Sequence, residues 1–310
     1  MKKFLGKCLL FIIIVLCACI GFIFLSAKEP TKAYITRWTN SQDYSGESGM
    51  LPYFERAKAE DGTTRLLIGD SICRQLFLPQ EAYNPDVSML PANAALMITG
   101  QYLLAEKYLE SHNDATDIYL VMHPLTLTRT WDREWSYRYA VMPAIETDTF
   151  QLLDENTVRD IQNTYGRLFT NKAMVQLIEE SPMLRKLYLS YEYINGKEYV
   201  QNTPFEVSDQ YIRKLSELCD EKGVKFHLYS SPVAEYYREK MVELGEDYKD
   251  TWMYSRFPKY MDSLFFYPSE WAGDLSHFSG EYAEQDKLNE IIYSAYAGTE
   301  LLQDIVCELK

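Results

Sequence analysis

The chain is poor in the residues that build metal centres and disulfide frameworks. It has six cysteines in 310 residues, and three of them fall within one apolar run near the N-terminus. No Cys-x-x-Cys pair occurs and the four histidines are scattered, so the sequence predicts neither a disulfide-stapled fold nor a metal site. A glycine-rich phosphate loop is missing as well, which argues against a nucleotide or flavin binder.

Positive charge is also scarce. The chain has 31 Lys and Arg against 45 Asp and Glu, for a net charge of −14. Nucleic-acid binding is therefore not expected, because clustered basic side chains supply phosphate affinity. Hydrophobic residues make up 47 % of the chain, which excludes a disordered or collagen-like protein, and the length suffices for one large domain or two small ones.

The N-terminus carries the only long apolar run. Three lysines in the first seven residues precede an uncharged stretch from Cys8 to Leu25. Its roughly 18 residues, at about 1.5 Å each, approach the thickness of a bilayer core. We predict residues 1–27 as a cytoplasmic tip and single transmembrane anchor, with the C-terminal domain extracytoplasmic at the cell membrane. The alternatives are a cleaved signal peptide ending near Ala27 and a lipoprotein signal at Cys19.

Strand and helix patterns alternate after a polar lead-in or stalk at 28–62. Between about 126 and 206 the pattern changes to helical segments rich in Trp, Tyr and charge, which we interpret as a helical insertion. The alternation predicts an α/β fold with a parallel sheet covered by helices on both faces, in a domain spanning 63–310. The predicted strands are 65–68, 86–90, 118–122, 224–229 and 263–267; the predicted helices are 72–78, 94–110, 208–221, 234–244 and 281–296.

Polar residues follow the predicted strands. Ser71, Asn93, His123 and Ser231 each come soon after one of the first four strands. Ligand sites of such sheets lie beyond the carboxyl ends of the strands, so a functional site is expected there.

A nucleophile, a base and an orienting carboxylate are all present. Ser71 stands at a strand-to-helix turn, where its hydroxyl is exposed and its amide lies near a helix N-terminus. Asp274 and His277 are three residues apart, which on one turn lets the carboxylate reach Nδ1 while Nε2 faces away. We predict Ser71 as nucleophile, His277 as base and Asp274 as the residue that orients His277.

Gly69-Asp70-Ser71 and Asp274-x-x-His277 resemble the two outer signatures of the SGNH/GDSL hydrolase superfamily, over roughly residues 63–298. The resemblance implies a flavodoxin-like three-layer α/β/α fold and serine-dependent acyl transfer or ester hydrolysis, with no metal and no organic cofactor. A single N-terminal anchor with an extracytoplasmic domain is similar to the DltD-like and exopolysaccharide O-acetylation branch. That likeness implies an envelope polysaccharide or teichoic-type polymer as substrate and a membrane-bound O-acyltransferase as partner.

The chain departs from the superfamily in the middle of the domain. Asn93 and Ala94 stand where a glycine amide usually completes the oxyanion hole, and His123 with Pro124 replaces Gly-x-Asn-Asp. His123 is either a substitute donor or a structural histidine. These departures leave a second function open, a non-catalytic binding or scaffold protein for an envelope-modification complex. The full set of oxyanion or substrate-binding candidates is Asn93, Ala94, His123, Asp70 and Arg74.

Two features allow a structural and a functional interpretation. The aromatic residues of the insertion, among them Trp131, Trp135, Tyr137 and Tyr139, form either a groove for sugar rings or a satellite hydrophobic cluster. His112 follows a serine in a polar segment and is expected to face solvent, whereas His227 lies within a predicted strand and is expected in the core.

Overall fold

The centre of the molecule is a parallel β-sheet. The computed structural model describes residues 2–39, 50–92, 97–128, 131, 133–189, 206–274 and 276–306. Four strands pair in the order β2-β1-β3-β4, all parallel. This is the doubly wound order of a flavodoxin-like sheet without a fifth strand, and it confirms the predicted α/β class. The strands are β1 (Arg65–Gly69), β2 (Val87–Pro91), β3 (Asp117–Met122) and β4 (Lys225–Ser230).

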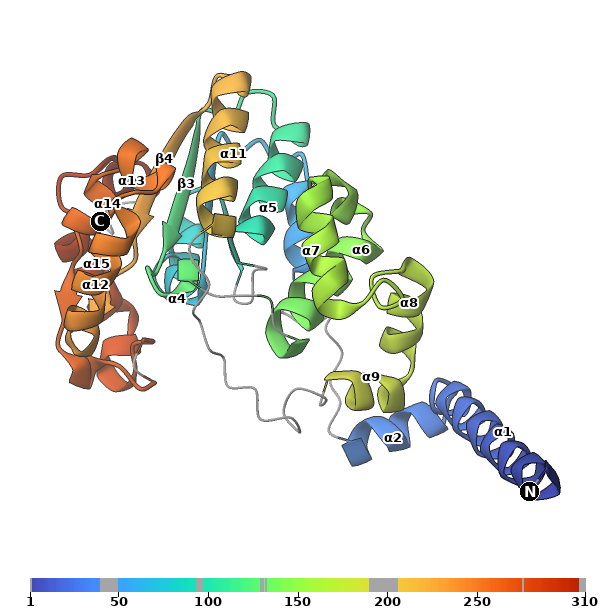
Figure 1. The fold of residues 1–310 in the computed structure, drawn as a ribbon. Helices are drawn as coiled ribbons and strands as arrows, with labels where there is room; N and C mark the ends of the chain where they lie inside the picture. Colours follow the sequence, from blue (N-terminus) through green and yellow to red (C-terminus); the bar gives the residue numbers. More distant parts are fainter. Residues whose placement is uncertain are drawn as a thin grey trace.

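Successive side chains of each strand enter two separate hydrophobic cores. In β1, Leu66 and Ile68 pack into a core shared with α5 and α11, while Leu67 between them packs on the other face with α4, α15 and α16. All three side chains are fully buried, which explains why the strand is an unbroken apolar run. Figure 1 shows the resulting layers, with α5 and α11 on one side of the sheet and α15 on the other.

The helices that cover the sheet come from both halves of the chain. Outside the insertion they are α3 (Leu51–Ala57), α4 (Ser71–Phe77), α5 (Met97–Ser111), α11 (Glu206–Lys222), α12 (Arg238–Tyr248), α13 (Trp252–Arg256), α14 (Lys259–Asp262), α15 (Gln285–Ala295) and α16 (Glu300–Ile305). Short 3₁₀ segments adjoin them: η1 (Leu78–Tyr83), η5 (Glu235–Tyr237), η6 (Ser269–Trp271) and η7 (Gly280–Ala283).

Every element in the described part of 126–206 is helical. Tyr137 is fully buried there, donates a hydrogen bond to the carbonyl of Phe169, and contacts Tyr165 and Tyr188. These rings therefore pack as a hydrophobic cluster rather than open a groove. The elements are η2 (Thr126–Thr128), the π-helix η3 (Arg133–Val141), α6 (Met142–Glu146), η4 (Thr149–Leu152), α7 (Glu155–Tyr165), α8 (Lys172–Glu180) and α9 (Pro182–Leu189).

The first four predicted strands are confirmed within one residue at each end, but the fifth is wrong as a strand of the main sheet. The segment predicted at 263–267 contains only β6 (Phe266–Tyr267), which pairs with β5 (Val233–Ala234) in a separate two-stranded sheet. The helix predicted from 234 accordingly begins at Arg238 instead. Ser208 does not cap α11, since the helix begins at Glu206 and the Ser208 hydroxyl donates to the carbonyl of Leu127.

The polar lead-in contains packed structure as well. Met50 and Phe54, in and just before α3, are fully buried in the core that covers one face of the sheet. The folded domain therefore begins by residue 50 rather than 63. This earlier boundary follows from the packing of α3 against both α5 and β2.

One long apolar helix begins the chain. Helix α1 (Lys2–Ser26) projects from the end of the molecule opposite α13, followed directly by α2 (Thr31–Thr39) (Figure 1). Among the described residues, Lys3–Ser26 is the one helix long and apolar enough to cross a membrane, and most of its side chains are exposed. A signal anchor and a signal sequence both fit this helix.

Candidate active site

The turn from β1 into α4 places a serine at the carboxyl edge of the sheet. Gly69 ends the strand, and a Cβ there would lie 2.2 Å from the carbonyl oxygen of Val121 and 2.6 Å from the Cβ of Cys73. Only glycine allows α4 to start this close to the sheet. Ser71 is the first residue of α4. Because the strand order reverses beside β1, this turn opens into the crevice where ligands of doubly wound sheets bind.

Ser71, His277 and Asp274 form a continuous hydrogen-bonded row. Ser71 Oγ lies 2.7 Å from His277 Nε2, although 206 residues separate them in the chain. His277 Nδ1 lies 2.7 Å from Asp274 Oδ2. A carboxylate on Nδ1 keeps the proton there, so Nε2 is free to accept the proton of the serine hydroxyl. The structure thus brings together the three residues expected to act together, and their catalytic role stays a prediction.

The backbone of the Asp274–His277 turn is itself held by the aspartate. Asp274 Oδ1 accepts from the amide of His277 at 2.8 Å and from that of Ser276 at 3.3 Å. Partial burial alone would raise the pKa of Asp274, but the hydrogen bonds from the His277 amide and ring lower it below the usual range of a carboxyl group. Asp274 therefore stays ionised at neutral pH beside the ring that it orients.

A short β-bridge carries the histidine into place. Ala272 and Phe278 pair antiparallel, and the amide of Gly273 donates to the carbonyl of His277. The Tyr267 hydroxyl donates to the carbonyl of Ser276 at 2.9 Å. These contacts fix the backbone on both sides of His277, so the imidazole does not depend on its side-chain contacts alone for its position.

Gln75 adds a link that the sequence analysis missed. Its Nε2 donates to the carbonyl of Phe278 at 2.6 Å, and its Oε1 accepts from the amide of Phe278 at 2.8 Å. Gln75 lies one helical turn after Ser71, so the helix that carries the serine also clamps the residue after His277. The i,i+4 spacing from Ser71 was the one available signal, since it puts both side chains on the same face of α4.

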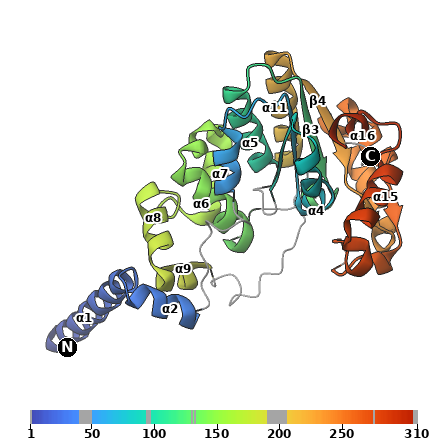
Figure 2. The ribbon, with the colours of Figure 1, turned by 180° about the vertical axis from the view of Figure 1, so that it is seen from behind.

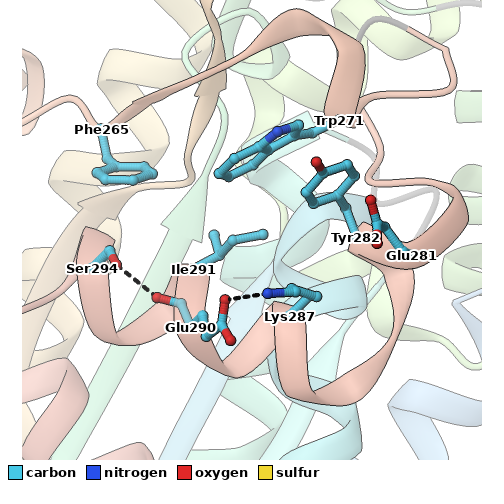
Figure 3. Close-up of a pocket in the computed structure, with 8 residues that line it drawn as sticks. All are labelled: Phe265, Trp271, Glu281, Tyr282, Lys287, Glu290, Ile291 and Ser294. Carbon is cyan, nitrogen blue, oxygen red and sulfur yellow. Dashed lines mark hydrogen bonds and ion pairs between the residues drawn. The ribbon is translucent and has the colours of Figure 1, made fainter.

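An aromatic stack supports the other side of this loop. Trp271 lies parallel to Tyr282, with ring centroids 4.6 Å apart, and nearly parallel to Tyr267 at 6.3 Å. Figure 3 shows Trp271 and Tyr282 over a pocket of about 350 Å³ that Ser71 does not line. Lys287 pairs with Glu290 in this pocket. Because Trp271 stacks on two tyrosines, we assign these rings to supporting the loop.

Two residues of this row, Ser71 and His277, line a broad surface pocket. Its volume is about 470 Å³, and its lining residues are Ser71, Arg74, Gln75, Leu78, Pro79 and His277. Arg74, predicted as a substrate contact, therefore lies in the same pocket as the serine. The pocket mixes one cation with apolar carbons, which suits a polar substrate that carries negative charge or many hydroxyl groups.

Asp70 has a structural role instead of the predicted role in substrate binding. Its side chain is buried; Oδ1 accepts from the amides of Ile72 and Cys73, which caps α4. Oδ2 accepts from the amide of His123 and the hydroxyl of Thr126, both at 2.8 Å. A carboxylate satisfied by four donors ties the end of β1 to the end of β3 and is not available to a substrate.

His123 is buried behind this turn. Its Nδ1 accepts from the amide of Leu125 at 3.2 Å, and its ring packs edge-on against Tyr237 with centroids 5.9 Å apart. Asn93 and Ala94, the other predicted oxyanion donors, lie outside the described residues. Ser231 is fully buried beyond β4 and does not line the pocket.

No group of three or more metal-binding side chains occurs in the described ranges. His227 contacts Asp117 at 2.9 Å and Glu300 at 3.0 Å, near the amino ends of the strands and away from Ser71. His112 is buried, with Nε2 on Asp61 and Nδ1 on the carbonyl of Tyr108, so the expectation that it faces solvent is wrong.

Cys73 does not compete with Ser71 as a nucleophile. It is fully buried, and burial together with the nearby Asp70 charge raises the pKa of its thiol well above the ordinary value. The thiol is thus protonated and inaccessible at neutral pH. Ser71, which is half-buried and lines the pocket, is the candidate nucleophile of this turn.

Comparison with known proteins adds no relative: the chain matches no protein-family model, no curated protein and no solved structure.

Proposed function

We propose that this protein is a serine acyltransferase or esterase of the SGNH/GDSL type. The observation that carries the proposal is the 2.7 Å contact between Ser71 Oγ and His277 Nε2, with Asp274 on the other ring nitrogen. Nucleophilic catalysis by a serine needs this pair and its carboxylate, and both Ser71 and His277 line the surface pocket.

The reaction begins with attack of Ser71 Oγ on the carbonyl carbon of an acyl ester. His277 Nε2 takes the hydroxyl proton, and the carbonyl π electrons move onto oxygen in a tetrahedral intermediate. Collapse of the intermediate breaks the bond to the leaving alcohol, which receives the proton from Nε2, and leaves an acyl-serine. A sugar hydroxyl or water then attacks the acyl-serine with the same proton transfers in reverse order.

The amide of Ser71 is the oxyanion donor within the described residues. Asp70 accepts from the next two amides of α4 and does not accept from that of Ser71. The amide therefore lies beside the attacking oxygen, where negative charge develops. The predicted contribution of Asn93 and Ala94 would complete the hole from the loop after β2.

The substrate we propose is an envelope polysaccharide or teichoic-type polymer outside the cytoplasm. Helix α1 serves as an uncleaved anchor with its lysines in the cytoplasm, which holds the domain against the membrane. An open pocket accepts one unit of a long chain without threading it. A membrane-bound O-acyltransferase is the proposed acyl source, because a tethered acceptor serine meets a membrane partner at high local concentration.

A fluorophosphonate probe tests the catalytic assignment. We expect it to label the wild type and not Ser71→Ala, with the two proteins melting at the same temperature. Ser276→Ala is the matched control, because only the backbone of Ser276 takes part in the hydrogen bonds that hold the loop. Equal labelling of Ser71→Ala overturns the assignment, and an unlabelled but folded wild type supports the scaffold alternative.

A partition experiment separates transfer from hydrolysis. The purified protein is incubated with a p-nitrophenyl ester, with and without a soluble oligosaccharide of the envelope polymer. Acylated oligosaccharide formed in a Ser71-dependent way indicates transfer. Free acid as the only product, at saturating oligosaccharide, indicates an esterase.

A further inference from the structure

The end of helix α1 is fastened to the folded domain. Ser26, its last residue, is fully buried, and its Oγ lies 2.7 Å from Ser181 Oγ, just before α9. The Ser181 hydroxyl also lies 3.1 Å from the carbonyl oxygen of Ile23. Figures 1 and 2 show α1, α2 and α9 together at one end of the molecule. The apolar helix is therefore docked where it meets the domain rather than joined by a free linker.

The residues around this junction present an unusual surface. Tyr34 and Trp38, four residues apart on one face of α2, are 70 % and 68 % exposed, and Leu187 of α9 is 60 % exposed. Ile35 of the same helix is buried, so α2 has one face packed on the domain and another face apolar but open. We name the open side chains the base surface: Tyr34, Trp38 and Leu187, with the cations Lys28, Lys32, Arg37 and Lys186.

The charge of the base surface is opposite to that of the whole chain. It has four cations against one acidic residue, Glu29, in 27–39 and 182–189, in a protein of net charge −14; the exposed Glu180, just before Ser181, is the next acidic side chain along the chain. Aromatic rings with polar tips, flanked by Lys and Arg, are the residues that favour the boundary between lipid headgroups and acyl chains. Such cations are attracted to any anionic headgroup beside them, and salt screens that attraction beyond about 10 Å.

We infer that the base surface lies in the lipid headgroup layer of the bilayer that α1 spans. This inference rests on the proposed anchor. Only Ala27 to Pro30 separate α1 from α2, and four residues reach at most about 14 Å. The headgroup layer is roughly 5–8 Å deep on each side, so α2 starts within or just above it.

This placement fixes how the active site faces the membrane. The strands β3 and β4 run downward in Figure 1 and end near α4, the helix that Ser71 begins, whereas α2 and α9 lie lower and to the right. Docking of Ser26 on Ser181 prevents free rotation of the domain about α1. The turn that carries Ser71 would thereby keep one orientation relative to the bilayer.

Fluorescence quenching by brominated lipid tests the inference on the full chain. The protein is reconstituted into vesicles of phosphatidylcholine and phosphatidylglycerol, with or without bromine on the upper acyl carbons. Trp38 is one of five tryptophans, so about a fifth of the emission is expected to be quenched and that fraction to disappear in Trp38→Phe. Trp252→Phe, altered in α13 at the far end of the molecule, is the control and keeps the quenching (Figure 1).

A second pair of variants tests the surface without removing the reporter. Tyr34→Asp with Leu187→Asp is expected to lower Trp38 quenching at least twofold. Tyr236→Asp with Leu168→Asp, whose side chains are 65 % and 59 % exposed elsewhere, leaves it unchanged. Equal quenching in wild type and Trp38→Phe overturns the inference, because it means that Trp38 does not contact the lipid.

Extraction with alkaline carbonate separates this inference from the anchor. If the wild type stays in the membrane and Trp38 is not quenched, the anchor stands and the base surface is refuted. If carbonate releases the wild type and Trp38 is not quenched, both are refuted. If carbonate releases it but Trp38 is quenched at neutral pH, the anchor and the inference as stated are both refuted, and lipid contact of Trp38 without a spanning helix is what replaces them.

Discussion

Removal of the Gln75 clamp is expected to slow catalysis without altering any residue of the catalytic row. In Gln75→Ala the amide and carbonyl of Phe278 lose both of their side-chain partners. Two such hydrogen bonds contribute about 1–3 kcal/mol together. The cost falls on the segment that holds His277, so the imidazole spends less time within reach of Ser71.

The size of the effect follows from the same free energy. Each 1.36 kcal/mol of lost positioning is tenfold in rate, so we expect fluorophosphonate labelling and kcat on a p-nitrophenyl ester to fall about 5- to 160-fold. KM is expected to change little, because the clamp acts on the histidine and not on the bound ester. The labelling rate and the kcat-against-KM split are the decisive measurements.

Gln80→Ala is the matched control for this experiment. Gln80 is a buried glutamine that donates to Asn289 of α15 and makes no contact with the loop of His277. Both variants are expected to unfold at lower urea concentration than the wild type. Gln75→Ala that labels as fast as Gln80→Ala refutes the clamp and leaves Gln75 as a stability residue only.

Three further predictions follow from single contacts. Asp274→Asn is expected to lower kcat about 10²- to 10⁴-fold with little change in melting temperature, because the imidazole loses the carboxylate that fixes its tautomer; unchanged kcat contradicts the assigned role. Gly69→Ala is expected to destabilise the fold by about 3 kcal/mol or more in urea unfolding, since the new Cβ meets the Val121 carbonyl at 2.2 Å; a loss below 1 kcal/mol would mean that α4 shifts freely. Asp154→Ala is expected to cost about 2 kcal/mol at pH 7, because Asp154 caps α7 and accepts from Lys214. Burial opposes ionisation of Asp154, but these hydrogen bonds hold the pKa of its carboxyl group far below 3.8. The difference in free energy of unfolding between wild type and variant is therefore complete above pH 3.8 and shrinks as the pH falls below it.

Local sequence pattern was sufficient to predict the strands of the sheet and the two segments of the site, 69–71 and 274–277. β1 and β3 are buried on both faces, which requires unbroken apolar runs, and Gly69 to Ser71 stand where such a run stops. Asp274 and His277 are three residues apart, so their mutual contact is a local property of one turn. Only the contact between His277 and Ser71 depends on the tertiary fold.

Contacts between polar residues that are far apart in the sequence could not be predicted from local pattern. Gln75 is a polar side chain in an amphipathic helix and resembles any surface glutamine until Phe278 is placed opposite it. His112 is similar, because Asp61, more than fifty residues earlier, removes the need for solvent. Asp70 was misassigned because a cap and a ligand contact require the same carboxylate, and only its four donors distinguish the two roles.

The distance along the chain between the two halves of the site has a consequence for biogenesis. During synthesis, which begins at the amino end, Ser71 is made long before residues 274–277, and 206 residues ahead of its hydrogen-bond partner His277. Until those residues fold back, the hydroxyl has no proton acceptor and is chemically no different from any other alcohol. A chain truncated before residue 274 would therefore lack both the proposed base and the carboxylate that orients it.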